Sequence, residues 1–176
     1  EGYSDTVSFG AFKKSTAEKV GLFDESLILN EDDDFNFKIS EAGGKIFISS
    51  EIHSIYYPRD TYLGLIKQYF GYGLWKVAVI KKHHKPARLS HLVPMLFVLF
   101  LVCGGLLSCS SRSLRKYYAG VLGLYGLIDA GASFTLKAED NPDGFMLRLR
   151  LLLIHFLLHV SYGCGFIAGI FRFGRR

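Results

Sequence analysis

The sequence Asn30-Glu31-Asp32-Asp33-Asp34 places four consecutive carboxylates directly before a segment with the apolar spacing of a helix, Phe35, Phe37, Ile39 and Ala42. Asparagine is a good N-cap residue, and acidic side chains in the first turn suit the positive end of the helix dipole. The glycine pair at 43–44 is a typical helix end. The sequence therefore predicts a helix from about residue 31 to residue 42.

Two interpretations of the acidic run remain open from its residues alone. In the structural one, the acids only cap and solubilise the helix. In the functional one, at least one carboxylate has another task, because four adjacent carboxylates repel one another and a helix start satisfies only some of them. A carboxylate aimed into a cleft can serve as a general base.

The segments around this helix predict a small α/β layer. Residues 6–12 are expected to form a strand, in which Gly10 and Ala11 allow close approach of a substrate or another backbone. Residues 15–18 fit a capping box and Gly21 fits a C-cap, which predicts a short helix over 16–20. Further strands are expected over 45–49 and 52–57. The order strand, helix, helix, strand indicates an α/β layer that is too short to make a nucleotide-binding sheet by itself.

Composition favours a membrane protein. The 176 residues carry a formal net charge of +5, and 49% of them are hydrophobic. This pairing is unusual for a nucleic-acid binder and ordinary for a membrane protein with basic flanks. Most charge lies in residues 1–88, and the long apolar runs lie in residues 89–176. Because the chain opens without Met, we interpret it as a fragment without its N-terminal part.

The second half of the chain predicts membrane helices. Residues 61–80 combine aromatic residues with lysines, which suits a helix in the membrane interface, although a buried core helix is the alternative. The basic run 81–88 is expected to attract anionic headgroups. Three apolar segments then predict spans over 89–110, 117–136 and 147–171. The basic residues near 112–116 and at the C-terminus conflict with a simple three-span topology, which leaves a re-entrant segment or further spans outside this sequence as alternatives.

Several side chains inside the apolar segments carry weaker expectations. Asp129 is costly within a span and is expected to pair with His155 or His159, which themselves pack toward another span. Small residues recur every fourth position at 161, 165 and 169, which favours close helix packing. The cysteines show neither metal-ligand spacing nor a disulfide framework, so they are expected to be small buried residues, Cys103, Cys109 and Cys164.

A set of short motifs resembles the second half of a family 2 glycosyltransferase. They are Gly10-Ala11-Phe12, Val20 to Glu25, Asn30-Glu31-Asp32, Glu41 to Gly44, Tyr57-Pro58-Arg59 and Gln68 to Gly73. Asp5-Thr6-Val7, His91 to Pro94 and Tyr162 to Phe166 narrow the resemblance to the succinoglycan-biosynthesis type of membrane glycosyltransferase. Each motif alone is weak, but their order and spacing cover nearly the whole chain.

The resemblance implies a fold and a division of the chain. Residues 1–60 would be the C-terminal, acceptor-side part of a GT-A (Rossmann-like) α/β catalytic domain. Residues 61–88 would be an amphipathic interface helix with a basic juxtamembrane segment, and 89–176 a transmembrane region of about three helices. The divalent metal, Mg²⁺ or Mn²⁺, and the nucleotide sugar would be bound mainly by the absent N-terminal half, so the fragment alone is expected to be inactive.

The resemblance also assigns roles to residues. Asp32 would be the catalytic base and Glu31 its neighbour that helps position the acceptor, whereas Asp33 and Asp34 are expected to be solvated. His53 would lie near a metal, with an ordinary strand residue as the alternative. The remaining residues are expected to bind substrate, namely Gly10, Ala11, Arg59, Gln68, Tyr72, Trp75 and Lys76. For Tyr72 and Trp75 the alternative is anchoring in the membrane interface. Processive synthases carry Q-x-x-R-W, and Gly71-Tyr72 stands at the Arg-Trp positions here, which favours transfer of a single sugar.

The leading hypothesis is therefore a membrane-bound inverting glycosyltransferase of exopolysaccharide biosynthesis, a hexosyltransferase of the EC 2.4 class. Its partners would be a nucleotide-sugar donor, a lipid-linked saccharide acceptor and the membrane, with no nucleic acid. It would lie in a bacterial-type inner membrane with the catalytic part in the cytoplasm. The alternative is a non-catalytic membrane scaffold or transport subunit with a small cytosolic cap.

Overall fold

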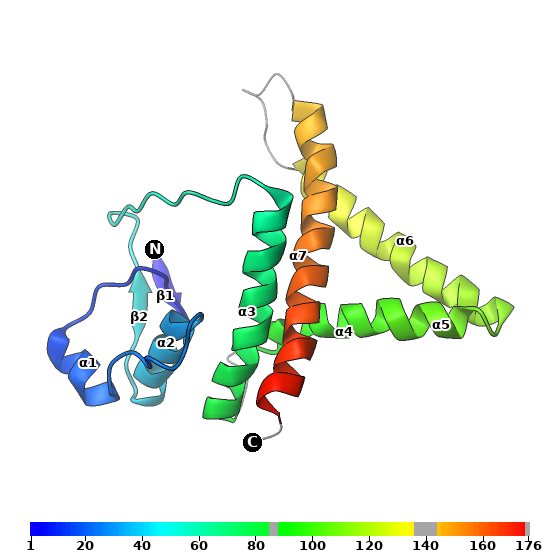
Figure 1. The fold of residues 1–176 in the computed structure, drawn as a ribbon. Coiled ribbons are helices and arrows are strands. Elements are labelled where there is room, and N and C mark those ends of the chain that lie inside the picture. The colour runs from blue at the N-terminus through cyan, green and yellow to red at the C-terminus, as the bar shows by residue number, and fades with distance from the viewer. Residues whose placement is uncertain (85–87, 136–143, 175–176) are drawn as a thin grey trace.

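The computed structural model describes residues 1–84, 88–135 and 144–174. A small lobe, residues 1–61, lies on one side of a long helix, and further helices lie on the other side (Figure 1). The elements in chain order are β1 (Gly2–Ser4), α1 (Lys14–Val20), α2 (Glu31–Glu41), β2 (Ile46–Ile48), α3 (Tyr62–His83), η1 (Leu89–Leu92), α4 (Val93–Leu99), the π-helical η2 (Phe100–Gly104), α5 (Gly105–Ser108), α6 (Arg112–Thr135) and α7 (Gly144–Phe173).

The lobe holds a two-stranded antiparallel sheet, β1 and β2, with Gly2 opposite Ile48 and Ser4 opposite Ile46. Its core is Ala17, Phe35, Ile39 and Ile46, which come from α1, α2 and β2. The α/β expectation therefore holds for the lobe alone, because the described residues as a whole are mostly helical.

The expected strands at 6–12 and 52–57 are wrong, because both stretches are irregular. A strand requires a neighbour for its backbone groups, and within the described ranges β1 and β2 pair only with each other. The predicted strand at 45–49 is confirmed as β2.

The two lobe helices form where the sequence predicts them, but their N-terminal caps differ. α1 begins at Lys14, and its N-cap Lys13 makes no side-chain cap, so the expected capping box is wrong. Gly21 is left-handed at φ 93° and ends α1, as predicted. Asn30 is also left-handed, at φ 63°, and does not cap α2. Its amide instead donates to the backbone oxygen of Tyr72 at 2.9 Å, which ties the start of α2 to α3.

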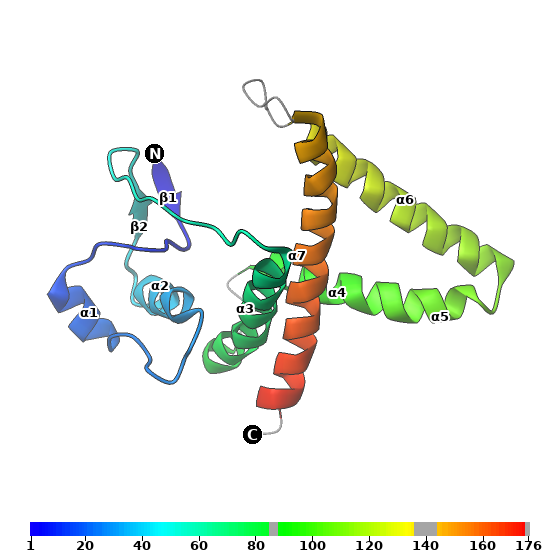
Figure 2. The same cartoon turned by 45° about the horizontal axis from the view of Figure 1, so that its top comes forward.

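Helices α3 and α7 run side by side in the same direction (Figures 1 and 2). Glycine brings the two backbones into contact, since a Cβ built on Gly165 would lie 2.0 Å from the Phe70 carbonyl oxygen. A Cβ on Gly73 would lie 2.0 Å from the Tyr162 carbonyl oxygen. Ser161, Gly165 and Gly169 are buried in α7, which confirms the predicted close packing of the small residues.

The segment α4–η2–α5 leads away from this pair, and α6 returns to it (Figure 2). α4 packs on α7 where a Cβ on Gly163 would lie 2.3 Å from the Pro94 carbonyl oxygen. Two helical segments are long and apolar enough to cross a membrane, Leu89–Ser108 and Gly144–Phe173. Residues 117–135 are helical within α6 but are not among those two segments, so the third span stays a prediction.

Polar side chains join α6 to α7. The Asp129 carboxylate lies 2.6 Å from Nδ1 of His155, which confirms the expected pair, and the Tyr125 hydroxyl lies 3.0 Å from Nδ1 of His159. The three cysteines are free thiols. Cys103 and Cys109 are exposed, so their expected burial is wrong. Among the described residues, η2 packs mainly against α4 and α5, and α5 packs mainly against η2 and α6.

Candidate active site

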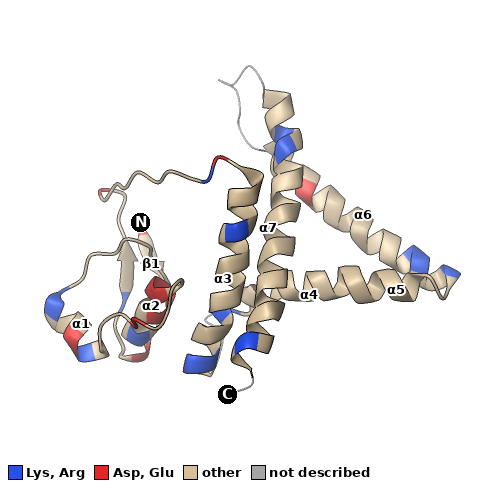
Figure 3. Ribbon diagram, in the orientation of Figure 1, with Lys and Arg blue, Asp and Glu red and all other residues tan. Residues whose placement is uncertain are grey.

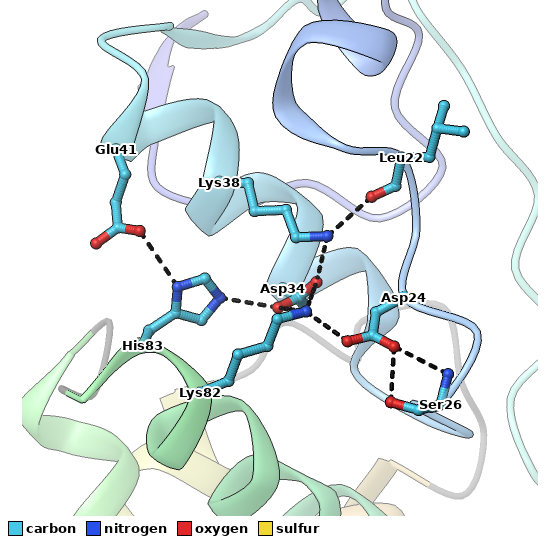
Figure 4. Close-up of polar contacts among 8 residues, drawn as sticks. All are labelled: Leu22, Asp24, Ser26, Asp34, Lys38, Glu41, Lys82 and His83. Atoms are coloured by element: carbon cyan, nitrogen blue, oxygen red, sulfur yellow. Dashed lines mark hydrogen bonds and ion pairs between the residues drawn. The ribbon is translucent and has the colours of Figure 1, made fainter.

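The four carboxylates at the start of α2, residues 31–34, have different contacts. Asp34 has no exposed surface and accepts from the ammonium groups of Lys38 at 3.0 Å and Lys82 at 2.9 Å, and Nε2 of His83 lies 2.8 Å from it (Figure 4). Lys38 lies on the next turn of α2, whereas Lys82 and His83 lie at the end of α3. Asp34 therefore holds the lobe against α3.

Two further carboxylates complete this cluster. Lys82 also contacts Asp24, in the loop before α2, and His83 Nδ1 lies 3.3 Å from Glu41 (Figure 4). Burial opposes ionisation of Asp34, but the hydrogen bonds from Lys82, Lys38 and His83 outweigh it and lower the pKa of Asp34. Burial likewise opposes the charge of Lys82, and its bonds to Asp24 and Asp34 outweigh that, so its pKa is raised. Both shifts stabilise the charged cluster.

Asp33 is paired in the same way, with a lysine nearly two turns earlier on α3. Its carboxylate contacts Lys76, which is buried, and accepts from the Thr6 hydroxyl at 3.2 Å. The expectation that Asp33 and Asp34 are solvated is therefore wrong. Both are neutralised by lysines more than forty residues further along the chain, which α3 brings to them.

Asp32 and Glu31 differ from their neighbours. Asp32 is half-buried, accepts from the Ser8 hydroxyl at 3.0 Å and accepts from the backbone N–H of Asp33 at 2.8 Å. Glu31 is exposed. Neither takes part in any ion pair seen among residues 1–84, 88–135 and 144–174. Asp32 is thus oriented by a hydroxyl and a backbone amide and, among the described residues, is paired with no cation.

The structure brings some of the predicted substrate-binding residues to α2. Gln68 donates to the hydroxyls of Tyr72, at 2.7 Å, and Tyr56, at 3.0 Å. Tyr72 also accepts from Asn30 through its backbone oxygen, and Lys76 contacts Asp33. Lys76 therefore contacts α2 directly, Tyr72 contacts the residue before α2 through its backbone, and Gln68 is linked to them through the Tyr72 hydroxyl.

Other predicted residues lie apart from these contacts. The Trp75 ring packs against the end of α7, with its centroid 5.4 Å from Phe173 and 5.4 Å from the Arg172 guanidinium. Arg59 is exposed in the linker before α3. Gly10 and Ala11 are exposed in the irregular stretch that also carries Ser8, so only their segment, through Ser8, reaches Asp32.

A divalent metal does not fit the residues described here. Those residues contain no group of three or more His, Cys, Asp and Glu side chains that could hold a metal ion. His53 is exposed on the irregular stretch after β2, and the carboxylates of Asp33 and Asp34 are already occupied by ammonium groups.

Lys38, Lys82, His83 and Ser8 belong to the site although the sequence did not indicate them. Lys38 stands four residues after Asp34, so helical spacing was a usable signal for that pair. Lys82 and His83 fall in the basic run, which predicted only lipid attraction. Ser8 carried no local signal. The part of that run at 85–87 lies outside the described residues.

The Asp34 cluster predicts a dependence of lobe docking on pH. Because the pKa of Asp34 is lowered in the folded protein, its contribution is complete above its unfolded pKa near 3.8 and is lost as the pH falls below that value. Limited pepsin digestion from about pH 5 to about pH 2 should therefore show α2 becoming cleavable below about pH 4. The Asp34→Asn variant should already be cleaved at about pH 5. Equal resistance of the variant and the wild type across the pH range would contradict the prediction.

Two known proteins are similar to this sequence. Succinoglycan biosynthesis protein ExoA of Rhizobium meliloti (strain 1021) is 28% identical over 179 aligned positions, covering 99% of this chain and 49% of that protein. A dolichyl N-acetyl-alpha-D-glucosaminyl phosphate 3-beta-D-2,3-diacetamido-2,3-dideoxy-beta-D-glucuronosyltransferase of Methanococcus voltae is 35% identical over 81 positions, covering 46% of this chain and 25% of that protein.

The remaining comparisons limit what these similarities show. The chain spans about half the length of the first relative and a quarter of the second. No family profile matches the sequence. No solved structure matches it. The similarities relate the chain distantly to a glycosyltransferase and, across nearly its whole length, to a protein of succinoglycan biosynthesis.

Proposed function

We propose that this chain is the acceptor-side and membrane-associated part of an inverting glycosyltransferase. The enzyme transfers a sugar from a nucleotide-sugar donor to a lipid-linked or growing polysaccharide acceptor in exopolysaccharide biosynthesis. The observation that supports this most is the division of the acidic run. Asp33 and Asp34 are paired with cations of α3, whereas Asp32 is held by neutral donors and stays available to accept a proton.

The proposed reaction is a single displacement. The acceptor hydroxyl oxygen bonds to the anomeric carbon of the donor sugar while Asp32 takes its proton. The bond between the anomeric carbon and the nucleotide diphosphate breaks, and the diphosphate leaves with the electron pair. Glu31, exposed beside Asp32, is proposed to position the acceptor.

The position of α2 supports an acceptor that is carried by a membrane. α2 is fixed to α3, and α3 packs along α7, one of the two segments apolar enough to cross a membrane. Gln68, Tyr72 and Lys76 of α3 are proposed to hold the acceptor. We also propose that the lobe is part of a GT-A domain, with Gly10, Ala11 and Arg59 on its substrate side, facing the cytoplasm of a bacterial-type cell.

The direct test of this function is transfer of a labelled sugar by the full-length protein in membranes. A panel of labelled nucleotide sugars is supplied, and label in the organic-solvent extract, which contains lipid-linked saccharides, is counted. We expect one donor to give label that depends on the protein. Absence of transfer from every nucleotide sugar tested, with the protein folded and membrane-bound, would favour the scaffold alternative.

Substitution of Trp75 tests whether its ring contacts the acceptor sugar. If its ring stacks on the acceptor sugar as well as packing on α7, Trp75→Ala loses a contact worth about 0.5–1.5 kcal/mol, and the acceptor KM rises several-fold. Trp75→Phe should restore much of the loss because it keeps a ring face. Initial rates against acceptor concentration, with donor saturating, measure this. Unchanged acceptor kinetics in Trp75→Ala would leave Trp75 with only its contacts to Phe173 and Arg172.

A further inference from the structure

The two segments apolar enough to cross a membrane do not share a direction. α7 runs beside α3, whereas α4–η2–α5 extends across α7 and away from it (Figures 1 and 2). The bilayer normal can therefore be parallel to one of these segments and not to the other.

Alignment of α7 with the bilayer normal conflicts with the lobe. α7 carries Arg148 and Arg150 near its start, and Tyr162 lies level with the part of α3 that contacts the lobe, because its carbonyl meets Gly73. The charged lobe has to stay outside the hydrocarbon. Residues 151–161 would then have to cross alone, and at 1.5 Å per residue they rise about 16 Å against a core of about 30 Å.

The same alignment also conflicts with α4–η2–α5. This segment begins beside Gly163 of α7, at the level of the lobe, and it is strongly apolar although Val98 is its only buried residue. It would lie in water with large apolar side chains exposed, among them Leu96, Leu99, Val102 and Leu106. A large exposed apolar surface of this kind is typical of a membrane contact.

The opposite alignment removes both conflicts. The geometry points to a membrane-inserted hairpin formed by Leu89–Ser108 and α6, which leaves the α3–α7 pair lying along the membrane surface beneath the lobe. The lobe and the hairpin depart from opposite sides of that pair (Figures 1 and 2). Residues 95–108, which lie beyond the Pro94 contact with α7, rise about 21 Å as helix, so the hairpin extends most of the way through a hydrocarbon core of about 30 Å from an α7 that lies in the interface.

The side chains of the hairpin fit lipid. Its two arms contact near the tip, where the Tyr118 ring lies 5.1 Å from Phe100 and its hydroxyl donates to the Leu101 carbonyl at 3.2 Å. The outer side of α6 exposes large apolar residues, Tyr117, Val121, Leu124 and Ile128. The tip carries Arg112, Arg115 and Lys116, whose long side chains can extend from the end of the apolar hairpin into water.

Charges elsewhere fit the same placement. Asp129 lies at the α7 end of α6, paired with His155, and so sits at headgroup level and not at the bilayer centre, where a carboxylate is costly. Basic residues lie along α3 and near the two ends of α7 (Figure 3), and their long side chains can reach anionic headgroups from helices in the interface.

Cysteine labelling of the full-length protein in sealed membrane vesicles tests this inference. In a cysteine-free background, Phe145→Cys and Phe171→Cys form a matched pair at the two ends of α7, with the native side chains 64% and 68% exposed. Glu18→Cys, on α1, marks the face of the lobe. Cys109, restored alone, marks the hairpin tip, and Cys103 marks its middle. A membrane-impermeant maleimide is applied to inside-out and to right-side-out vesicles.

We expect both ends of α7 to label from the same membrane face as Glu18→Cys. Cys109 should label from the opposite face, and Cys103 should label only after detergent is added. Labelling of Phe145→Cys and Phe171→Cys from opposite faces, or of either one only from the face opposite the lobe or only in detergent, would overturn the inference. Labelling of Cys109 from the face of the lobe would overturn it as well. No arm measures sugar transfer, so the outcome is independent of the proposed activity.

Discussion

Asp32→Asn in the full-length protein is expected to lower the rate of sugar transfer by about 10²- to 10⁴-fold, the usual cost of removing a general base. The amide keeps the size of the side chain and can still accept from the Ser8 hydroxyl, but it cannot take the proton of the acceptor hydroxyl. Donor binding should stay nearly unchanged, because the base acts on the acceptor. The measurements are the initial rate at saturating substrates and the equilibrium binding of the nucleotide sugar.

Asp60→Asn is the matched control for this variant. Asp60 is an exposed aspartate in the linker before α3, so the same loss of charge there should leave transfer at the wild-type rate. Wild-type turnover by Asp32→Asn with the natural acceptor would show that Asp32 is not the base. An equal loss in both variants would point to net charge and not to a base.

Gly165→Ala is expected to separate α3 from α7. A methyl group at Gly165 meets the Phe70 carbonyl oxygen at 2.0 Å, and because that atom belongs to a helix backbone it cannot move aside alone. Overpacking of this kind typically costs about 1–3 kcal/mol. The lobe, which is fixed to α3, should lose its docking with the helix pair, so transfer should fall together with stability.

Gly123→Ala makes the same chemical change in another helix, where we expect it to stabilise the protein. A Cβ at Gly123 of α6 meets nothing within 4 Å, so the substitution should add about 0.5–1 kcal/mol through the better helix propensity of alanine. Thermal unfolding of the purified full-length variants in detergent measures both changes. A Gly165→Ala protein as stable as the wild type would contradict the close contact of α3 with α7.

Local patterns in the sequence predicted the elements that depend on local rules. The apolar spacing after Asp34 and the glycines at 43–44 predicted α2, and Gly21 predicted the end of α1. The recurrence of small residues at 161, 165 and 169 predicted close packing of α7. Each of these signals acts within a few residues, so no knowledge of the rest of the fold is required.

The features that the sequence did not predict depend on distant partners. Residues 6–12 have the composition of a strand, yet a strand forms only where another strand lies beside it. Asp33 and Asp34 appeared to be solvated because their partners, Lys76 and Lys82, are more than forty residues away. The amide of Asn30 bonds Tyr72 and not α2, which helical capping rules do not anticipate.

The candidate site was therefore predicted in part. The motif that includes Glu31 and Asp32 selected the acidic run, but the reason that Asp32 differs from Asp33 and Asp34 is visible only when α3 is in place. Trp75 shows the reverse situation. Its aromatic character predicted sugar stacking, and the structure adds a packing role against Phe173 that no local pattern indicated.

We propose that two carboxylates in the first turn of α2 serve different purposes. Asp32 takes part in catalysis, and Asp34 docks the lobe on α3. Asp32→Asn and Asp34→Asn, made separately in the full-length protein, test this proposal when transfer rate and protease resistance of α2 are measured on the same samples. We predict that Asp32→Asn loses transfer and keeps wild-type resistance, whereas Asp34→Asn loses resistance. Loss of resistance in Asp32→Asn, or wild-type transfer by it, would contradict the account.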